Sequence, residues 1–421
     1  MQKRRLKFIL AICSSVISFL FSSQAIAGAL YLSQLVSPGS LGTAGVANVT
    51  NNVGTDSPFT NPAGMTGVMG DQVMGGLQLS IPSVRFDSSI AEAGGSDGGN
   101  ASFLSAIPGF YVVKPLSEKA RLGFSSAALL GGGVDYGSDF VGRYQATRAV
   151  LSGMGFSPSF GYRINDKVSV GAGVSFIYTI MDMDVAVNQS RFGLPDGAIH
   201  IDKIDDWGTQ GFFGVTWQVT DKARLGFVYR TESEVELEGD LDIKTQIPII
   251  NQVTSRLDEI GVDFNYAQAF TLGLAYKATD RVTLLMDLNF EDWSAFSDNF
   301  MSIQGGAITT TIERNWEDTW HVGAALAYQV SDEWFFTTGL AYDSSPVSDA
   351  DRTADLAVDE QVKFGMSYGK KGKGNLDYAV GFSYIWLGTG KIDQVAQGVR
   401  FKGEFDTNSL VFLGANLRYR F

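Results

Sequence analysis

Two histidines, His200 and His321, are the side chains of this 421-residue chain best suited to hold a metal ion or to act as a general base. A metal site would need thiolates or carboxylates beside them, and the only cysteine, Cys13, lies close to the N-terminus. A hydrolytic triad would need an activated serine, but no serine lies in a nucleophile-elbow motif. The sequence therefore predicts no catalytic residue, no metal ion and no cofactor, and His321 is predicted to be a polar residue that faces a wet interior.

The N-terminus has the pattern of a secretory signal peptide. Basic residues stand between residues 3 and 7, an apolar run covers 8–21, and Ala25-Ile26-Ala27 supplies small residues before a cleavage point. This run is short for a membrane-spanning helix, and no later stretch reaches about 18 uninterrupted apolar residues. We expect residues 1–27 to be removed on export, Cys13 with them, so that the remaining chain has no disulfide.

The composition favours a membrane barrel. The formal net charge of −13 argues against nucleic acid as a partner, because phosphates would be repelled. The chain holds 49 glycines and 12% aromatic residues, and apolar and polar positions alternate without helical period from Gln72 onward. From Val168 to Ile180, for example, apolar residues occupy the even positions, and small or polar residues occupy the odd positions apart from Ile177. The same argument assigns Phe264, Tyr266 and Phe270 to one outward face. Alternation would also fit a soluble β-sandwich, which is the alternative to a membrane barrel.

Short polar turns set the predicted strand number. Five of them, at residues 116–120, 164–168, 219–223, 278–282 and 330–334, share one pattern, and 369–376 is a looser sixth. Six turns at one end require seven hairpins, which gives a 14-stranded antiparallel transmembrane β-barrel over residues 71–421. Longer loops are expected at the other end, at 87–102, 135–148, 189–206, 240–263, 292–318, 343–360 and 388–408.

Residues 28–70 do not alternate and carry little charge. An open barrel of this width would leak, so we expect this segment to lie inside the lumen as a hatch, or plug. Within it, Asn61-Pro62-Ala63 forms a fixed kink, because Pro62 restricts its own φ and biases Asn61 toward extended geometry. Asn61 is expected to hydrogen-bond main-chain groups that have no ladder partner.

The order of several motifs resembles the outer-membrane long-chain fatty-acid transporter (FadL) family. The resemblance covers nearly the whole chain after residue 27 and rests on the segment 37–47, on Asn61-Pro62-Ala63, and on later segments at 229–232, 292–296, 332–336 and 343–347. It implies a monomer in the outer membrane of a Gram-negative bacterium, in contact with membrane lipids and lipopolysaccharide. It also implies facilitated diffusion of long-chain fatty acids or similar hydrophobic compounds, with no enzymatic activity. The terminal Phe421, with Tyr419 two residues before it, resembles the recognition signal of the barrel-assembly machinery.

Other functions stay open at this stage. Within the same family the cargo could be an aromatic hydrocarbon. A general porin should lack the hatch and carry facing rows of charge at a constriction. A surface adhesin is a further alternative, and an outer-membrane phospholipase or protease would need an activated serine in a nucleophile-elbow motif.

A lateral gate is expected in the third strand. Gly131, Gly132 and Gly133 remove three consecutive side chains, which favours a bend or bulge before Tyr136. The resemblance implies that such a kink opens the barrel wall and releases cargo sideways into the membrane. A glycine-rich turn that ends the strand is the alternative.

Two further sites are candidates. Ile250, Val253, Leu257 and Ile260 have helical spacing, and the resemblance implies that this helix and a second loop with Phe192 and Leu194 form an external apolar groove; a cap over the barrel mouth is the alternative. The resemblance also implies a cation for the cargo carboxylate, and Arg314 is the candidate, unless it is a rim charge.

Overall fold

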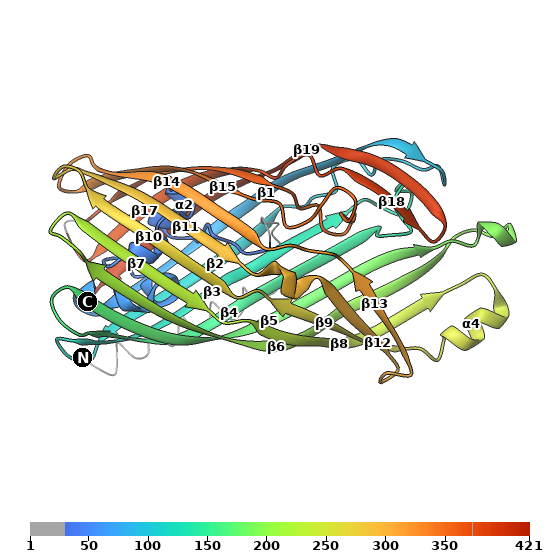
Figure 1. The fold of residues 1–421 in the computed structure, drawn as a ribbon, viewed down its shortest axis with the longest axis horizontal. Coiled ribbons are helices and arrows are strands. Elements are labelled where there is room, and N and C mark those ends of the chain that lie inside the picture. Colours follow the sequence, from blue (N-terminus) through green and yellow to red (C-terminus); the bar gives the residue numbers. More distant parts are fainter. Residues whose placement is uncertain (1–29, 373) are drawn as a thin grey trace.

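One closed antiparallel barrel of 14 wall strands forms the body of the protein (Figure 1). The computed structural model describes residues 30–372 and 374–421, so the predicted signal peptide, 1–27, lies outside the described residues. The barrel closes where the first strand pairs with the last, from Gln72 opposite Arg420 to Ala91 opposite Phe401. The predicted fold class is confirmed. In chain order the wall strands are β1 (Gln72–Ala91), β2 (Ser105–Pro115), β3 (Ala120–Asp135), β4 (Arg148–Arg163), β5 (Val168–Val187), β6 (Gly197–Gln218), β7 (Ala223–Arg230) continued by β8 (Ser233–Lys244), β9 (Glu259–Tyr266) continued by β10 (Ala269–Lys277), β11 (Val282–Glu291), β14 (Thr319–Gln329), β15 (Trp334–Asp343), β16 (Gln361–Lys370), β17 (Leu376–Trp386) and β19 (Val399–Arg420).

The two ends of the barrel differ in their connections. Short turns join β2 to β3, β4 to β5, β6 to β7, β10 to β11, β14 to β15 and β16 to β17, as predicted. We call this the short-turn end, and the C-terminus lies there (Figure 1). At the opposite, long-loop end, β12 (Asp298–Ile303) with β13 (Ile308–Glu313) forms an added hairpin, and β18 (Ile392–Ala396) pairs with β19.

Several strands continue where loops were predicted. The predicted loops 189–206 and 388–408 are largely strand, and both ends of 240–263 are strand, because β6, β8, β9 and β19 reach into them. A tilted strand needs about 9–11 residues to cross a membrane, whereas β6 and β19 each have 22. In β8, buried Val235 and Leu237 alternate with exposed Glu234 and Glu236. The strand period is kept, but charged residues replace apolar ones on the outward face beyond the membrane.

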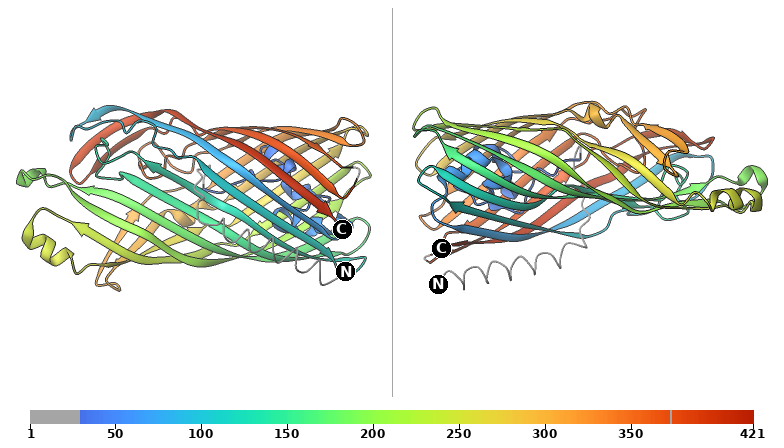
Figure 2. Two further views of the ribbon diagram at one scale, coloured as in Figure 1. Left: turned by 180° about the vertical axis from the view of Figure 1, so that it is seen from behind. Right: turned by 90° about the horizontal axis from the view of Figure 1, so that it is seen from below.

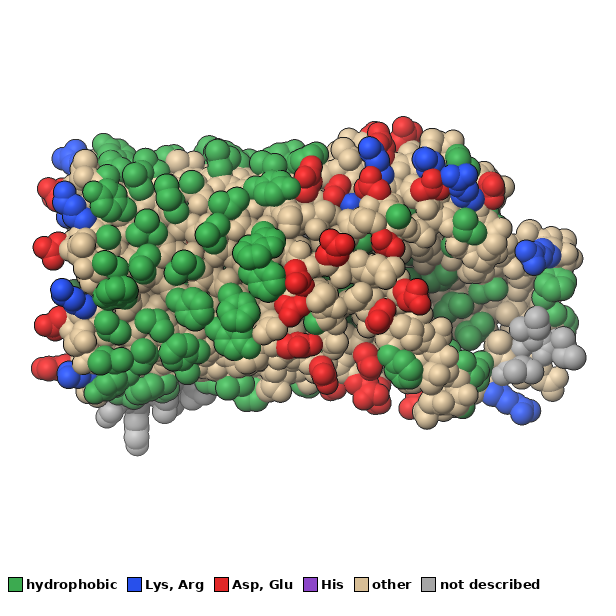
Figure 3. Space-filling view, in the orientation of Figure 1, with side chains coloured by type: hydrophobic (Ala, Val, Ile, Leu, Met, Phe, Trp, Pro, Cys, Tyr) green, Lys and Arg blue, Asp and Glu red, His purple; other side chains and the backbone are tan. Residues whose placement is uncertain are grey.

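An apolar belt surrounds the half of the barrel near the short turns. Large exposed side chains such as Leu272, Met286, Leu288 and Val322 point outward there. Figure 3 shows hydrophobic side chains over this half and acidic side chains beyond it. The belt is what a lipid-exposed barrel surface requires.

Between β9 and β10, the set of alternate residues that points outward shifts by one position. Phe270 is 40% exposed, but Phe264 and Tyr266, predicted on the same face, are 2% and 0% exposed and point into the lumen. Residues 267 and 268 interrupt the strand at this point. An irregularity of this kind shifts the alternation by one residue and moves a whole set of side chains to the other face.

The N-terminal segment, residues 30–71, lies inside the barrel toward the short-turn end (Figure 2). We call it the hatch. It contains α2 (Pro38–Gly42), η1 (Asn48–Thr50), α3 (Ser57–Thr60) and η2 (Pro62–Gly67), and the remaining helices are η3 (Ser190–Phe192), α4 (Pro248–Thr254) and η4 (Trp293–Phe296). Within 30–372 and 374–421, no helix is long and apolar enough to cross a membrane.

Lumen-facing glycines let the main chain of the hatch approach the wall. A Cβ at Gly226 would lie 2.1 Å from the carbonyl oxygen of Val49, and a Cβ at Gly339 would lie 2.2 Å from that of Thr43. Such distances exclude any side chain at these positions without movement of the hatch. The high glycine content therefore reflects, in part, a tightly seated plug.

Candidate functional site

The wall has a window between β2 and β3. These two strands pair only from Pro115 opposite Arg121 to Phe110 opposite Ser126, whereas β3 stays paired with β4 as far as Asp135. Beyond Ser126, β3 therefore has a wall neighbour on one side only. The pairing resumes at the far edge, where the amide of Asp135 donates to the carbonyl oxygen of Ala101 at 2.7 Å.

A β-bulge bends β3 at the window. The register against β4 shifts between Ala128 and Leu130, immediately before Gly131, Gly132 and Gly133. The freed edge of β3 pairs with the hatch instead: the amide of Leu32 donates to the carbonyl oxygen of Leu129 at 2.7 Å, and Tyr31 forms an isolated antiparallel bridge with Leu130. The N-terminal residues of the hatch thus cover the window from inside.

A cavity of about 980 Å³ lies at the window. It extends from Leu32 of the hatch, past Leu130 and Gly131, to outward-facing residues of the wall. These outer lining residues include Phe103, Leu104, Met154, Phe156, Tyr178 and Trp207. The cavity therefore joins the lumen side of β3 to the lipid-facing surface.

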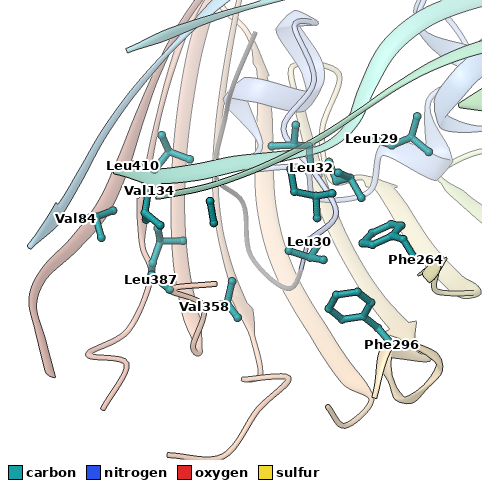
Figure 4. Packing of buried hydrophobic residues seen from close by; sticks show 14 of the residues in the cluster. Leu30, Leu32, Val84, Leu129, Val134, Phe264, Phe296, Val358, Leu387 and Leu410 are labelled. Atoms are coloured by element: carbon teal, nitrogen blue, oxygen red, sulfur yellow. The ribbon is translucent and has the colours of Figure 1, made fainter. Parts of the chain in front are cut away.

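A second, narrow apolar cavity lies on the inner side of β3. Gly131, Gly132 and Gly133 form part of its lining, together with Leu30, Val262, Phe264, Phe296, Met301, Ile312 and Val358. Figure 4 shows Leu30, Phe264, Phe296 and Val358 directed toward a common space. Tyr136 lies beyond this space: its hydroxyl donates to the carbonyl oxygen of Ala354 at 2.9 Å, and its ring stacks on Phe140 at 4.0 Å. All three glycines therefore line the inner cavity and Gly131 also lines the window cavity, while Tyr136 connects two long loops.

Asn61 joins the hatch to the wall. Its Nδ2 donates to the carbonyl oxygens of Val49 at 2.7 Å and of Val215 at 3.1 Å, and its Oδ1 accepts from the amide of Ala63 at 3.0 Å. Asn61 and Ala63 are fully buried, and Pro62 begins η2. Asn61 therefore bonds main-chain groups, as expected, but only Val49 lies outside a strand, because Val215 belongs to the β6 ladders. The role of Asn61 in transport stays a prediction.

His321 belongs to a buried ion-pair network. Its ring pairs with Asp343, which also pairs with Lys363, and its Nε2 lies 3.3 Å from Asp287 Oδ1. The other oxygen of Asp287 accepts from the amide of Ala47 in the hatch at 2.7 Å. In the part of the chain that the structure describes, no three His, Cys, Asp or Glu side chains form a metal-binding group. The network therefore connects wall and hatch.

Arg314 lines the inner apolar cavity, but its guanidinium is occupied. Nη2 pairs with Asp355 at 2.8 Å, Nη1 donates to Thr353 at 3.2 Å, and Nε donates to Asn299. Burial raises the pKa of the Asp355 carboxyl, but the opposing charge of Arg314 outweighs this and holds that pKa below its usual range. A cargo carboxylate at Arg314 would have to compete with Asp355, so carboxylate binding by Arg314 stays a prediction.

The predicted external groove is only partly formed by a helix. α4 ends at Thr254, Leu257 follows it, and Ile260 lies in β9, where it is 1% exposed and faces the lumen. The prediction that Ile260 lies on this helix was therefore wrong, because the chain enters a strand at Glu259. Phe192, the last residue of η3, and Leu194 are exposed, while the side chains of Ile250 and Val253 lie outside the described residues. The groove itself stays a prediction.

Sequence reasoning missed three lumen residues that the structure brings to the hatch: Tyr31, Arg230 and Asp287. Asp287 carried a usable signal, because it is a lone carboxylate in an otherwise apolar strand segment, Leu284–Leu288. Tyr31 and Arg230 carried none, since each becomes distinct only through contacts across more than 100 residues.

Comparison with known proteins gives the family. Residues 18–421 match the family model described as "Outer membrane protein transport protein (OMPP1/FadL/TodX)". The chain is 22% identical to the long-chain fatty acid transport protein of Salmonella typhi over 99% of this chain and 98% of that one. It is 21% identical to the protein of the same name from Escherichia coli (strain K12), over 96% of both.

Solved structures show the same fold. A FadL homologue from Pseudomonas aeruginosa superposes with a TM-score of 0.86 at 20% identity, covering 94% of this chain and 100% of that one. The toluene transporter TodX from P. putida superposes with a TM-score of 0.70 at 18% identity, covering 94% and 99%. The chain therefore belongs to the OMPP1/FadL/TodX family of Gram-negative outer-membrane β-barrel transporters, which carry hydrophobic compounds and are not enzymes.

Proposed function

We propose that this protein takes up long-chain fatty acids or similar hydrophobic compounds by facilitated diffusion and releases them sideways through the window between β2 and β3. The observation that carries the proposal is the interrupted pairing of these strands beyond Phe110 and Ser126, with a cavity that reaches the lipid-facing surface. The names of the curated relatives support fatty acids as cargo.

Free energy favours a lateral route over a water-filled pore. Exposing a buried methylene group to water costs about 0.8 kcal/mol, so a long acyl chain pays many times this amount in an aqueous channel. The inner apolar cavity and the window cavity share Leu130, Gly131 and Val150 in their linings. A cargo molecule that passes from one to the other meets mainly apolar side chains, with Asp182 in the lining of both cavities and Arg148, Lys203 and Asp205 in that of the window cavity.

The hatch residues Leu30, Tyr31 and Leu32 control this passage in our proposal. Leu30 lines the inner cavity and Leu32 lines the window cavity, while Tyr31 is bridged to Leu130 between them. Breaking the bridge and the hydrogen bond from Leu32 to Leu129 would connect the inner cavity to the window cavity, and through it to the membrane.

A reversible cross-link tests the route. Antiparallel bridge partners lie about 4.5–5.5 Å apart at Cα, within reach of a disulfide, and the only native cysteine is Cys13. In a Tyr31→Cys/Leu130→Cys variant, oxidation should abolish uptake of radiolabelled oleate, and dithiothreitol should restore it. The matched control is Val112→Cys/Phe124→Cys, a pair in the closed part of the β2–β3 ladder, where oxidation should leave uptake unchanged.

Equal uptake by the oxidised and reduced Tyr31→Cys/Leu130→Cys protein would remove the window from the route. A general porin is tested separately: a radiolabelled sugar should not enter proteoliposomes that contain the protein, and rapid sugar flux would overturn hydrophobic transport.

Monoaromatic hydrocarbons are the second candidate cargo. Two aromatic rings, Phe264 and Phe296, line the inner cavity. Behind them, Trp293 and Trp316 contact Phe296 and each other edge to face, with centroids 4.8–6.3 Å apart. The toluene transporter TodX shares the fold. Competition between toluene and oleate for binding would decide between the two cargo classes.

Contacts with lipopolysaccharide, recognition of Phe421 by the assembly machinery and a monomeric state stay predictions.

A further inference from the structure

The connection between β15 and β16, residues 344–360, folds back into the barrel at the long-loop end, and we call it the inner loop. It contains no helix and no strand, yet Ala354, Ala357 and Val358 are buried. Residues 355–358 line the inner apolar cavity, and Figure 4 shows Val358 among the side chains directed into it. The inner loop therefore forms one wall of this cavity.

The inner cavity is too small for a long hydrocarbon chain unless one of its walls moves. Its volume is about 60 Å³, whereas an engineered protein cavity that binds benzene has about 150 Å³. Apart from Leu30, Phe296, Arg314 and residues 355–358, the lining residues lie in strands, where ladder hydrogen bonds resist displacement. The inner loop contributes four consecutive residues without such a ladder, so it is the part of the lining that can move at the lowest cost.

One buried arginine holds the inner loop in its folded shape. Arg352 is fully buried and donates to the carbonyl oxygens of Val358, within the loop, and of Lys391, outside it, both at 2.8 Å. Its Nη2 pairs with Asp359 at 2.8 Å. Arg352 therefore fixes the fold of the inner loop and also ties it to the chain beside β18.

Further polar contacts join the inner loop to the rim of the barrel. Asp355 pairs with Arg314 at 2.8 Å. The amide of Ala354 donates to Gln145 Oε1 at 2.7 Å, and the carbonyl oxygen of Ala354 accepts from the hydroxyl of Tyr136 at 2.9 Å. Taking an ion pair out of water costs about as much as the pair gains. Water that reaches these groups when the loop moves outward therefore offsets much of the lost contact, and the loop can both close and open.

We propose that the inner loop is the entry gate for cargo: it moves outward to admit a hydrophobic molecule to the inner cavity from the long-loop end, and it closes over that molecule. This inference rests on the proposed transport function and adds the residues that control entry. Arg352 and the Arg314–Asp355 pair act as positioning residues that hold the gate closed.

Holding the inner loop shut tests the gate. Asn315 Nδ2 donates to Asp351 Oδ1 at 2.9 Å in an exposed contact between the rim and the inner loop. In an Asn315→Cys/Asp351→Cys variant, a bis-methanethiosulfonate reagent should bridge the two thiols, and dithiothreitol should remove the bridge. We expect the bridged protein to lose uptake of radiolabelled oleate and the reduced protein to regain it. The matched control is Asp393→Cys/Lys402→Cys, an exposed pair across the β18–β19 ladder, where the bridge should leave uptake unchanged.

Access to the cavity from outside is the second measurement. Val358→Cys places a thiol in the inner cavity, and its reaction with a membrane-impermeant maleimide on intact cells reports opening of the inner loop. Adding Arg352→Met should speed this reaction about tenfold or more, because a hydrogen bond to a charged group is worth at least that factor. A thiol at exposed Val395 should react at the same rate with and without Arg352→Met.

The outcomes separate this inference from the proposed function. Full oleate uptake by the bridged Asn315→Cys/Asp351→Cys protein, or equal labelling of Val358→Cys with and without Arg352→Met, would overturn the gate and leave transport intact. If the wild type takes up no oleate, the proposed function itself fails. Heat modifiability on gels verifies that each variant is a folded barrel, and the bridged variant decides the matter if Arg352→Met is not.

Discussion

At the short-turn end the lumen is filled mainly by the main chain of the hatch, whereas toward the long-loop end it is filled by large side chains. Near the hatch, the wall presents glycines such as Gly226 and Gly339. The hatch main chain lies so close to them that a Cβ on either glycine would be within 2.2 Å of a hatch carbonyl oxygen. Toward the loops, Phe86 contacts Phe140 and Phe405 edge to face at 5.7 and 5.3 Å. The first region is packed by main-chain atoms, and the second is packed by side chains.

This difference shows how one barrel can be both sealed and permeable to hydrophobic molecules. Main-chain contacts and hydrogen bonds such as those of Asn61 and Asp287 depend strongly on direction and distance. Apolar contacts do not, so side chains around the cavities can yield to cargo of variable shape. We expect substitutions at the two ends to act differently. Substitutions at the hatch should make the barrel leak small solutes, whereas substitutions toward the long loops should change the order of those loops and the affinity for cargo.

The largest effect is expected from the buried Arg314–Asp355 pair, whose side chains are 4% and 6% exposed. Arg314→Met or Asp355→Leu alone leaves a lone buried charge, which costs about 3–5 kcal/mol, whereas the double substitution should cost much less. Protease cleavage within residues 344–360 should rise in each single variant and return toward the wild-type rate in the double variant. Additive effects of the two changes would contradict a coupled pair.

The same pair predicts a pH dependence. The pKa of Asp355 lies below its ordinary value of 3.8, so its stabilising effect is complete above that value and is lost as the pH falls through the lowered folded-state pKa. Cleavage of residues 344–360 by an acid-active protease should therefore stay slow at pH 5 and rise only under stronger acid. Arg314→Met/Asp355→Leu should lack this acid transition.

A smaller effect is expected from filling the seat of the hatch. In Gly339→Ala the new Cβ would lie 2.2 Å from the carbonyl oxygen of Thr43, and overpacking of this kind costs about 1–3 kcal/mol or more. We expect normal barrel assembly but a hatch that is cleaved more readily and admits small antibiotics. Gly75→Ala is the matched control, because the nearest atoms to its Cβ lie 3.9 Å away. Equal antibiotic sensitivity of the two variants would mean that the hatch tolerates displacement.

The smallest effect is expected from Asn61→Ala. This change leaves the carbonyl oxygens of Val49 and Val215 without their donor, at a cost of about 1–3 kcal/mol. We expect normal assembly with reduced oleate uptake. Asn52→Ala serves as the control, because the Asn52 side chain makes no hydrogen bond to the described residues. If Asn61→Ala takes up oleate normally and resists protease like the wild type, Asn61 has no part in transport.

Local pattern was sufficient for the architecture. Alternation and six polar turns predicted 14 strands, and the low charge of residues 28–70 predicted a segment inside the lumen. Both signals arise from near neighbours: the period of a strand is two residues, and a tight turn is defined by about four. The kink near Gly131–Gly133 was expected for the same reason, and the structure places the bulge at Leu129.

What the sequence by itself could not determine is everything that depends on register. One interruption at residues 267–268 moved Phe264 and Tyr266 from the lipid face to the lumen, and no local pattern marks such a shift. The charges follow the same rule. Arg314, expected to be available for a carboxylate, is paired with Asp355. Arg230 forms no ion pair with the described residues and donates instead to the carbonyl oxygen of Phe59, 171 residues away. The state of a buried charge depends on which strand lies opposite, and only the closed barrel decides that.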